Sequence, residues 1–345
     1  MGMALVSFAT NGAAQSGRLK ESKPRPKPGP TPIAERERRA SSHKPATVVT
    51  NSPKESANEV DSSDVVHISA NLVPIPASVV DTKGFAVTGL RLDDFELLID
   101  GQPRAISEMT RADTPVRLAM LFDNSGSLDS AREFEKQAAL HFFRRVMRAS
   151  DEAAVYSVET ESYLAQALTG DIRKLEQTIA GFGRPQGATS LFDAIVDAAA
   201  YLRPYRGRRV IVIVSDGVDT ISRTDFETTI KWVLRDDCQI FVVQTGLYEG
   251  ANLRALAAER RMEQLAIQTG GAVYVPKTIS DLETAFQQIA ADLAHQYVLS
   301  YYQSDEHRDG RFHVIDLRIK ARKDVRVRAR KGYYSPKGAS MVSEW

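Results

Sequence analysis

The sequence has one cysteine, almost no net charge and no long apolar run, and each shortage excludes a class of protein. Cys238 is the only cysteine among 345 residues, so neither an intrachain disulfide nor a cysteine-based zinc site can form. The formal net charge is +1, which argues against electrostatics as the main binding force and makes nucleic acid a poor candidate partner. No run approaches the roughly 18 apolar residues that a membrane helix needs, so we expect no membrane span.

The first 64 residues are predicted to contain no folded domain. Residues 1–17 are apolar and small and end like a signal-peptide cleavage site, although no Lys or Arg precedes Arg18. We interpret them as a truncated signal peptide and expect an exported protein; the alternative is a disordered cytoplasmic tail. Residues 18–64 are rich in Pro, Ser, Lys, Arg and Glu, which predicts a disordered linker. Residues 337–345 are expected to form a short tail.

The rest of the chain divides into three parts by the spacing of its apolar residues. Residues 65–111 contain short apolar runs broken by turn signals, typical of a small antiparallel sheet. Residues 112–295 alternate strand-like and helix-like runs, which predicts a mostly parallel sheet with helices on both faces. Residues 296–336 return to a period of two. We therefore predict a doubly wound, Rossmann-like α/β domain inserted into a small β-sandwich formed by the N- and C-terminal flanks.

Three polar loops stand at the ends of apolar runs or at the start of a helix. The first, Asp123-Asn124-Ser125-Gly126-Ser127, follows LAMLF, and the third, Ser215-Asp216-Gly217, follows VIVIV. The second, Gly187-Ala188-Thr189-Ser190, opens the helix-like run LFDAIVDAAA. In an open parallel sheet, ligands bind beyond the carboxyl ends of the strands, where the strand order reverses. We expect the three loops to meet there.

The chemistry of these loops predicts a metal site for a hard cation. They would gather two carboxylates and three hydroxyls without any imidazole or thiolate, which suits Mg²⁺, Mn²⁺ or Ca²⁺ and not zinc or copper. Mg²⁺ prefers six oxygen ligands and keeps several waters. With only two negative charges nearby, the ion would still attract a third carboxylate, so we predict that an Asp or Glu of a protein partner completes the shell.

The same residues resemble a known binding site. Asp123-x-Ser125-x-Ser127, with Thr189 and Asp216, is similar to the complete metal-ion-dependent adhesion site of von Willebrand factor type A (VWA) domains. The VWA-like part covers about residues 117–294. The resemblance implies that Ser125 and Ser127 bind Mg²⁺ (or Mn²⁺) directly and that Thr189 does so in the tight-binding state. It also implies that Asp123 and Asp216 act mostly through water.

The flanks extend the resemblance. VVDTKGFAVTGLRLDDFELLIDGQPRAI before the domain, and QYVLSYY with VRARKGYYSP after it, resemble the VWFA-related family known mainly from Acidobacteria, whose members are mostly predicted exported proteins. In VWA relatives the last helix slides when ligand binds. Here that helix, Asp281 to about His295, runs directly into the flanking strands, and we hypothesise that the β-sandwich reads out binding through it.

The preferred function is a divalent-metal-dependent, adhesion-type binding module rather than an enzyme, with two alternatives. One is a structural scaffold of an envelope assembly with a vestigial metal site; the other is a metal-dependent phosphoesterase. Phosphatases of the haloacid dehalogenase kind have a second Asp where this chain has Ser125, and no Gly-x-Ser-x-Gly elbow or P-loop occurs. The sequence predicts neither the partner's identity nor an oligomeric state. Histidines without a visible general-base pairing are interpreted as ordinary: His67, His141, His295 and His313.

Overall fold

A computed structural model of the chain describes residues 71–111, 114–124, 132–183, 187–245, 253–304, 309–320, 322 and 324–336. All of them fall within one unit, residues 66–345. The predicted signal peptide and linker and the predicted tail lie outside the described residues. Ser125 and Ser127 of the first predicted loop lie outside them as well.

The centre of the α/β part is a six-stranded sheet in the order β10-β9-β8-β5-β6-β7. Neighbouring strands are parallel except β6 and β7, which are antiparallel. Leu118, Val212 and Val242 on the central strands are each 0% exposed, because both faces of the sheet are covered. The strands are β5 (Val116–Asp123), β6 (Glu152–Val158), β7 (Tyr163–Thr169), β8 (Arg208–Ser215), β9 (Cys238–Gln244) and β10 (Ala272–Tyr274).

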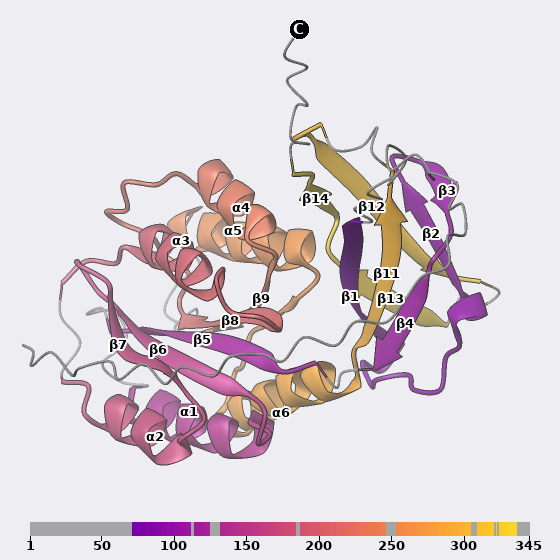
Figure 1. Cartoon of the computed structure of the whole chain (residues 1–345). Helices are drawn as coiled ribbons and strands as arrows, with labels where there is room; N and C mark the ends of the chain where they lie inside the picture. The colour runs from indigo at the N-terminus through magenta and orange to yellow at the C-terminus, as the bar shows by residue number, and fades with distance from the viewer. Residues whose placement is uncertain are drawn as a thin grey trace, which may run out of the picture. The chain divides into compact units, whose positions relative to one another are not determined.

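Helices cover both faces of this sheet, α1, α2 and α6 on one side and α3, α4 and α5 on the other (Figure 1). Phe286 belongs to the apolar cluster between the sheet and α1, α2 and α6. Ile195 belongs to the cluster between the other face of the sheet and α3, α4 and α5. Helix α6 begins with a capping box in which Thr278 Oγ1 accepts a hydrogen bond from the Asp281 amide. None of the described helices combines the length and apolar character needed to cross a membrane. The helices are α1 (Arg132–Val146), α2 (Ile172–Ala180), α3 (Leu191–Leu202), α4 (Phe226–Arg235), α5 (Leu253–Thr269) and α6 (Ile279–His295).

Two four-stranded sheets are built from strands of both flanks, in the orders β13-β1-β11-β4 and β14-β12-β2-β3. Their shared core includes Ile75, Leu299, Leu97 and Ile99, each at most 2% exposed. The strands are β1 (Asn71–Asp81), β2 (Phe95–Ile99), β3 (Gln102–Arg104), β4 (Glu108–Arg111), β11 (Tyr297–Gln303), β12 (Phe312–Ile319), β13 (Val325–Ala329) and β14 (Gly332–Tyr334). The predicted α/β domain inserted into a β-sandwich is confirmed.

Helix α6 passes directly into β11, and Gln296 at this junction is 1% exposed. Its Nε2 donates to Gln239 Oε1 on β9 (2.8 Å) and to Ser78 Oγ on β1 (3.2 Å). Its Oε1 accepts from Arg208 Nη1 on β8 (2.9 Å). One buried amide therefore ties the sandwich to two strands of the α/β sheet.

Two ion pairs join the same parts of the molecule. Arg328 of β13 donates from Nη2 to both carboxylate oxygens of Asp292 on α6, each at 2.6 Å. Arg330, which follows β13, pairs with Asp237 before β9 and also donates to the Pro74 carbonyl on β1 (2.6 Å). These contacts fix the end of β13 against the α/β domain.

Candidate functional site

The reversal of strand order lies between β5 and β8. After β5 the chain adds β6 on one side, and it later returns to place β8 on the other side of β5. Asp123 is the last residue of β5, and Asp216 follows Ser215, the last residue of β8. Two of the five predicted ligands therefore stand at the carboxyl ends of the two strands that flank the switch point, where ligands bind in open α/β sheets.

Asp123 is fully buried and is tied to the third loop. Ser215 Oγ donates to Asp123 Oδ2 at 2.5 Å, and the Gly217 amide donates to Ser215 Oγ at 2.9 Å. A hydrogen bond to a carboxylate is stronger than one between neutral groups. The Ser215 hydroxyl therefore holds the Asp123 carboxylate and the start of the third loop in one arrangement.

Thr189 is 5% exposed and is tied to the third loop through its backbone. Its amide donates to Thr220 Oγ1 (2.8 Å), and its carbonyl accepts from the Thr220 amide (2.9 Å). Its own hydroxyl makes no hydrogen bond to any described residue. The side-chain oxygen is thus left for another ligand.

Asp216 is half-buried, and only one of its carboxylate oxygens is engaged within the described part of the chain. Oδ1 accepts from the Val218 amide (2.8 Å), and the Asp216 carbonyl accepts from Gln244 Nε2 (2.9 Å). Gly217 next to it has φ +81°, in the left-handed region that glycine adopts at little cost. This turn fixes Asp216 and leaves its Oδ2 for another ligand.

A residue outside the predicted motif links the first and second loops. Glu159, directly after β6, accepts at Oε1 from Asn124 Nδ2 (2.7 Å) and from Ser157 Oγ (2.6 Å). Its backbone carbonyl accepts from the Ser190 amide (3.0 Å) and from Ser190 Oγ (2.7 Å). Glu159 was not predicted, because it belongs to no pattern that the sequence reveals by spacing. Ser215 was placed in the third loop, but its hydrogen bond to Asp123 was not predicted.

The described donors fit a magnesium-type ion by their chemistry. Asp123, Thr189 and Asp216 offer carboxylate and hydroxyl oxygens, which hard cations prefer. Among the described residues, no group of three or more His, Cys, Asp or Glu side chains is placed to hold a metal. The predicted site draws on hydroxyls as much as on carboxylates, so this does not conflict with it. Ser125 and Ser127 complete the predicted set from outside the described residues.

His313, which we interpreted as ordinary from the sequence, lies between two carboxylates. Its Nδ1 lies 2.7 Å from Asp100 Oδ2, and its Nε2 lies 3.2 Å from Asp309 Oδ1. Asp100 lies 213 positions away in the sequence, so only the pairing of β2 with β12 brings the two together. Both ring nitrogens face carboxylates, which suits a structural charge cluster in the sandwich rather than a general base.

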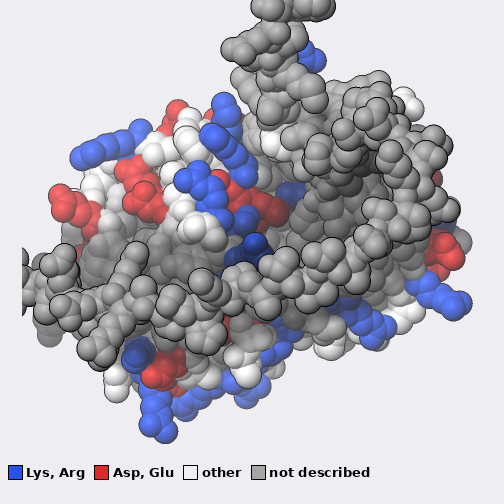
Figure 2. Space-filling model, viewed as in Figure 1, with Lys and Arg blue, Asp and Glu red and all other residues white. Residues whose placement is uncertain are grey.

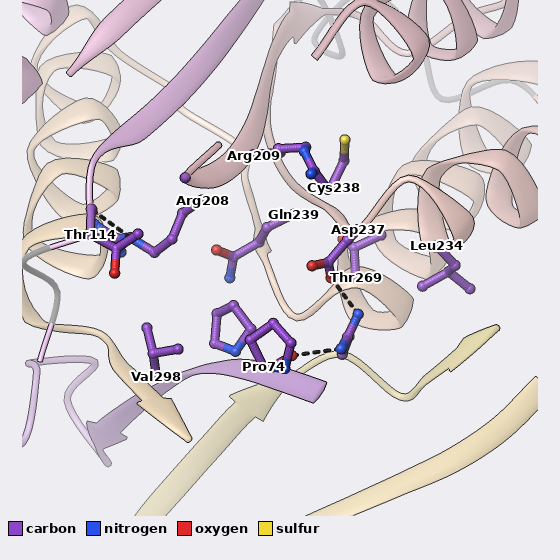
Figure 3. A pocket seen from close by; sticks show the side chains of 13 residues that line it. Pro74, Thr114, Arg208, Arg209, Leu234, Asp237, Cys238, Gln239, Thr269 and Val298 are labelled. Atoms are coloured by element: carbon purple, nitrogen blue, oxygen red, sulfur yellow. Dashed lines mark hydrogen bonds and ion pairs between the residues drawn. The ribbon is translucent and has the colours of Figure 1, made fainter. Parts of the chain in front are cut away.

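A cavity of about 180 Å³ lies at the opposite, amino-terminal ends of β8 and β9 (Figure 3). Arg208 on its wall is 7% exposed, and burial lowers the pKa of its guanidinium to about 10. The guanidinium donates to Gln296 Oε1 and to the Thr114 carbonyl (3.4 Å). The cavity shares no residue with the predicted site, so it does not compete with it for the same ligand.

The described surface around the α/β helices carries charges of both signs. Figure 2 shows Lys and Arg side chains beside Asp and Glu side chains over α3, α4 and α5. Interspersed charges produce a weaker field than a patch of one sign.

A known protein family matches part of the central domain. Residues 118–218 match the von Willebrand factor type A domain family, so a VWA domain is present there. This match extends from β5 through the first two loops to Asp216. A comparison with the curated proteins finds no match.

Solved structures that align with part of this chain are distant in sequence. An aerotolerance-related membrane protein from Bacteroides fragilis is 19% identical, with a TM-score of 0.42, over 51% of this chain and 98% of that chain. The vWF domain of the type V pili tip protein Mfa5 from Porphyromonas gingivalis is 12% identical, with a TM-score of 0.42, over 51% and 94%. A von Willebrand factor type A protein from Catenulispora acidiphila is 9% identical, with a TM-score of 0.45, over 79% and 74%.

Proposed function

We propose that this chain is a divalent-metal-dependent protein-binding module of the adhesion type. VWA domains mediate protein–protein interactions, and residues 118–218 are such a domain. The observation that supports the metal-dependent part is that Asp123 and Asp216 lie at the ends of neighbouring strands at the switch point, and that the Thr189 hydroxyl and Asp216 Oδ2 have no hydrogen-bond partner among the described residues. The proposed ligands of one Mg²⁺ or Mn²⁺ ion are Asp123, Ser125, Ser127, Thr189 and Asp216.

The bound ion would supply a position for a carboxylate of the partner. Mg²⁺ is commonly held by one or two carboxylates and keeps several waters, so coordination positions remain for a further oxygen ligand. An Asp or Glu side chain of the partner would replace one of these waters. The affinity for the partner would then depend on the metal.

The protein's own contribution is to hold the three loops before the ligand arrives. Ser215 ties Asp123 at the start of the first loop to the third loop, and Thr220, three residues after the third loop, ties the second loop to the same segment of the chain. Groups that are already ordered lose less conformational freedom on binding. We infer that the described donors are preorganised for a ligand at this edge of the sheet.

Thr189 provides the sharpest test, because its hydroxyl has no bond to lose among the described residues. We expect Thr189→Val in the full-length chain to weaken Mg²⁺ binding, measured by titration calorimetry, by about tenfold or more. Thr189→Ser keeps the hydroxyl and should stay within about threefold of the wild type. Equal affinity in the wild type and Thr189→Val would contradict the assignment of Thr189 as a ligand.

Acetate, as a stand-in for the partner's carboxylate, tests the second half of the proposal. We expect Mg²⁺ to bind the wild-type protein more tightly when acetate is present, because acetate can occupy the position offered to the partner. Mg²⁺ binding that is absent both with and without acetate, in a folded protein, would favour the scaffold alternative. Release of phosphate from a phosphomonoester that is lost in Asp123→Ala would favour the phosphoesterase alternative.

The proposal also includes export, which rests on the apolar, small-residue composition of residues 1–17. Fractionation of cells that produce the full chain tests it. Recovery of the protein only with cytoplasmic markers would contradict export without affecting the metal site.

A further inference from the structure

Glu159 stands next to the candidate site although it is not one of the predicted ligands. It follows the last residue of β6, the strand that pairs with β5 on the side away from β8. The Asn124 amide donates to the carbonyl of Val158 (2.8 Å), so the loop after β5 begins beside Glu159. The position of Glu159 is therefore set by the same sheet that sets Asp123.

The contacts of Glu159 reach the immediate neighbours of two predicted ligands. Its carboxylate accepts a hydrogen bond from the side chain of Asn124, which follows Asp123. Its backbone carbonyl accepts two hydrogen bonds from Ser190, which follows Thr189. We propose that Glu159 is a positioning residue that holds Asn124, directly after β5, and Ser190, directly before α3, in their relative arrangement. Its effect on metal affinity rests on the proposed function.

The behaviour of Ser190 supports this role. Ser190 occupies the N-cap position of α3, where a serine hydroxyl usually accepts a hydrogen bond from a backbone amide of the first turn. Here it makes no such cap bond; it donates to the Glu159 carbonyl and lies 2.8 Å from Ser162 Oγ. Helix α3 therefore lacks the usual N-cap hydrogen bond, and the Ser190 hydroxyl binds the Glu159 carbonyl instead.

Asn124 shows the same pattern. It is 5% exposed, and its Oδ1 is buried without a hydrogen-bond partner among the described residues. Burial of an unpaired amide oxygen is unfavourable. The orientation of the side chain follows instead from its donation to Glu159 Oε1. A carboxylate accepts this bond more strongly than a neutral group and offers no donor, so it holds the Asn124 amide in one orientation.

Five variants of the full-length chain, four single and one double, separate positioning from other roles. Glu159→Ala and Asn124→Ala each remove one end of the same hydrogen bond, and their combination completes a double-mutant cycle. Glu159→Gln keeps an oxygen acceptor. Glu161→Ala is the matched control, because it removes the same charge from an exposed position two residues further on.

The first measurement needs no metal. We expect amide hydrogen exchange at Asn124 and Ser190 of the metal-free protein, whose amides donate to the Val158 and Glu159 carbonyls, to become faster in Glu159→Ala and in Asn124→Ala, and to be unchanged in Glu161→Ala. Unchanged exchange in Glu159→Ala would overturn the proposal, whether or not the protein binds metal. If exchange is faster in Glu159→Ala but the wild-type protein binds no Mg²⁺, the positioning role stands. That result counts against the proposed function alone.

The second measurement is Mg²⁺ titration of each folded variant. We expect Glu159→Ala and Asn124→Ala each to weaken Mg²⁺ binding about tenfold, and the double variant to be no weaker than either, because both changes break one bond. Glu159→Gln should stay within about threefold of the wild type. Losses that multiply in the double variant, or a Glu159→Ala affinity equal to that of Glu161→Ala, would overturn the proposal. A residue that supports stability alone would change the melting temperature and leave the affinity of the folded protein unchanged.

Discussion

At the scale of single residues, the third loop depends on a backbone conformation that glycine adopts easily. Gly217 has φ +81°, and a Cβ added there would lie 2.8 Å from Met262 Cγ and 3.2 Å from Gln244 Nε2. We expect Gly217→Ala to lower the free energy of unfolding by about 2–3 kcal/mol, through backbone strain together with overpacking. Chemical denaturation measures the change.

Gly84 provides the control for Gly217. Its φ is +87°, and an added Cβ would meet nothing within 4 Å. Gly84→Ala should therefore lower the free energy of unfolding only through backbone strain, by about 1 kcal/mol. Equal losses for the two variants would show that Met262 moves aside freely and that packing against the third loop is loose.

His313 leads to a prediction about pH. It is 5% exposed, and although burial disfavours its charged form, the hydrogen bonds and charges of Asp100 and Asp309 raise its pKa above the usual value. A pKa that is higher in the folded state stabilises the protein fully below the unfolded value of about 6.5. This contribution is lost as the pH rises through the folded value. We expect the free energy of unfolding to fall more steeply above about pH 6.5 in the wild type than in His313→Asn, and parallel pH profiles would contradict the assignment.

The residues of the candidate site differ in how far the sequence could reveal them. Asp123 and Asp216 could be placed because each follows a continuous apolar run, and the ends of buried parallel strands meet at one edge. The bond of Ser215 to Asp123 and the contact of Glu159 with Asn124 could not be predicted, because these hydrogen bonds connect positions 92 and 35 apart in the sequence. Such pairs depend on strand order and register, which the spacing of apolar residues does not encode.

At the scale of elements, the antiparallel edge strand β7 was not predicted, whereas β5 and β8 were, from the runs LAMLF and VIVIV. The buried strands form uninterrupted apolar runs, but β7 has two exposed residues at its start and no clear alternation. Its pairing with β6 also contains register shifts. Strands of this kind are defined by their neighbour more than by their own sequence.

The ion pair between α6 and β13 is the element-scale contact that we expect to matter most. Asp292 is 5% exposed, and burial raises the pKa of its carboxyl despite the opposing charge of Arg328. Removal of one partner leaves a buried charge, so Asp292→Ala should lower the free energy of unfolding by about 3 kcal/mol.

Replacement of both partners by apolar side chains is the control for this pair. Asp292→Leu combined with Arg328→Met should recover most of the lost stability, because no buried charge remains. Denaturant titration of the single and double variants gives the coupling free energy between Asp292 and Arg328. A double variant that is as unstable as the sum of its single changes would show that the pair acts through packing and not through charge.

At the scale of the whole molecule, the contacts of Gln296, Arg328 and Arg330 join the sandwich to the α/β domain through buried groups. Structural units joined in this way unfold together when the loss of one leaves buried polar groups of the other unpaired. We expect scanning calorimetry of the wild type to show one transition, and Arg328→Ala combined with Arg330→Ala to show two. Two transitions in the wild type would contradict this coupling.

The same measurement tests whether the sandwich responds to a ligand of the α/β domain, as the continuity of α6 with β11 led us to hypothesise. A ligand that binds only the folded state raises the transition of every unit that unfolds cooperatively with its site. We therefore expect Mg²⁺ with acetate to raise the single transition of the wild type. In Arg328→Ala combined with Arg330→Ala, the same additions should raise only one of the two transitions. If both transitions still rise by equal amounts, Gln296 and the direct passage of α6 into β11 suffice for the coupling, and the two ion pairs are not required.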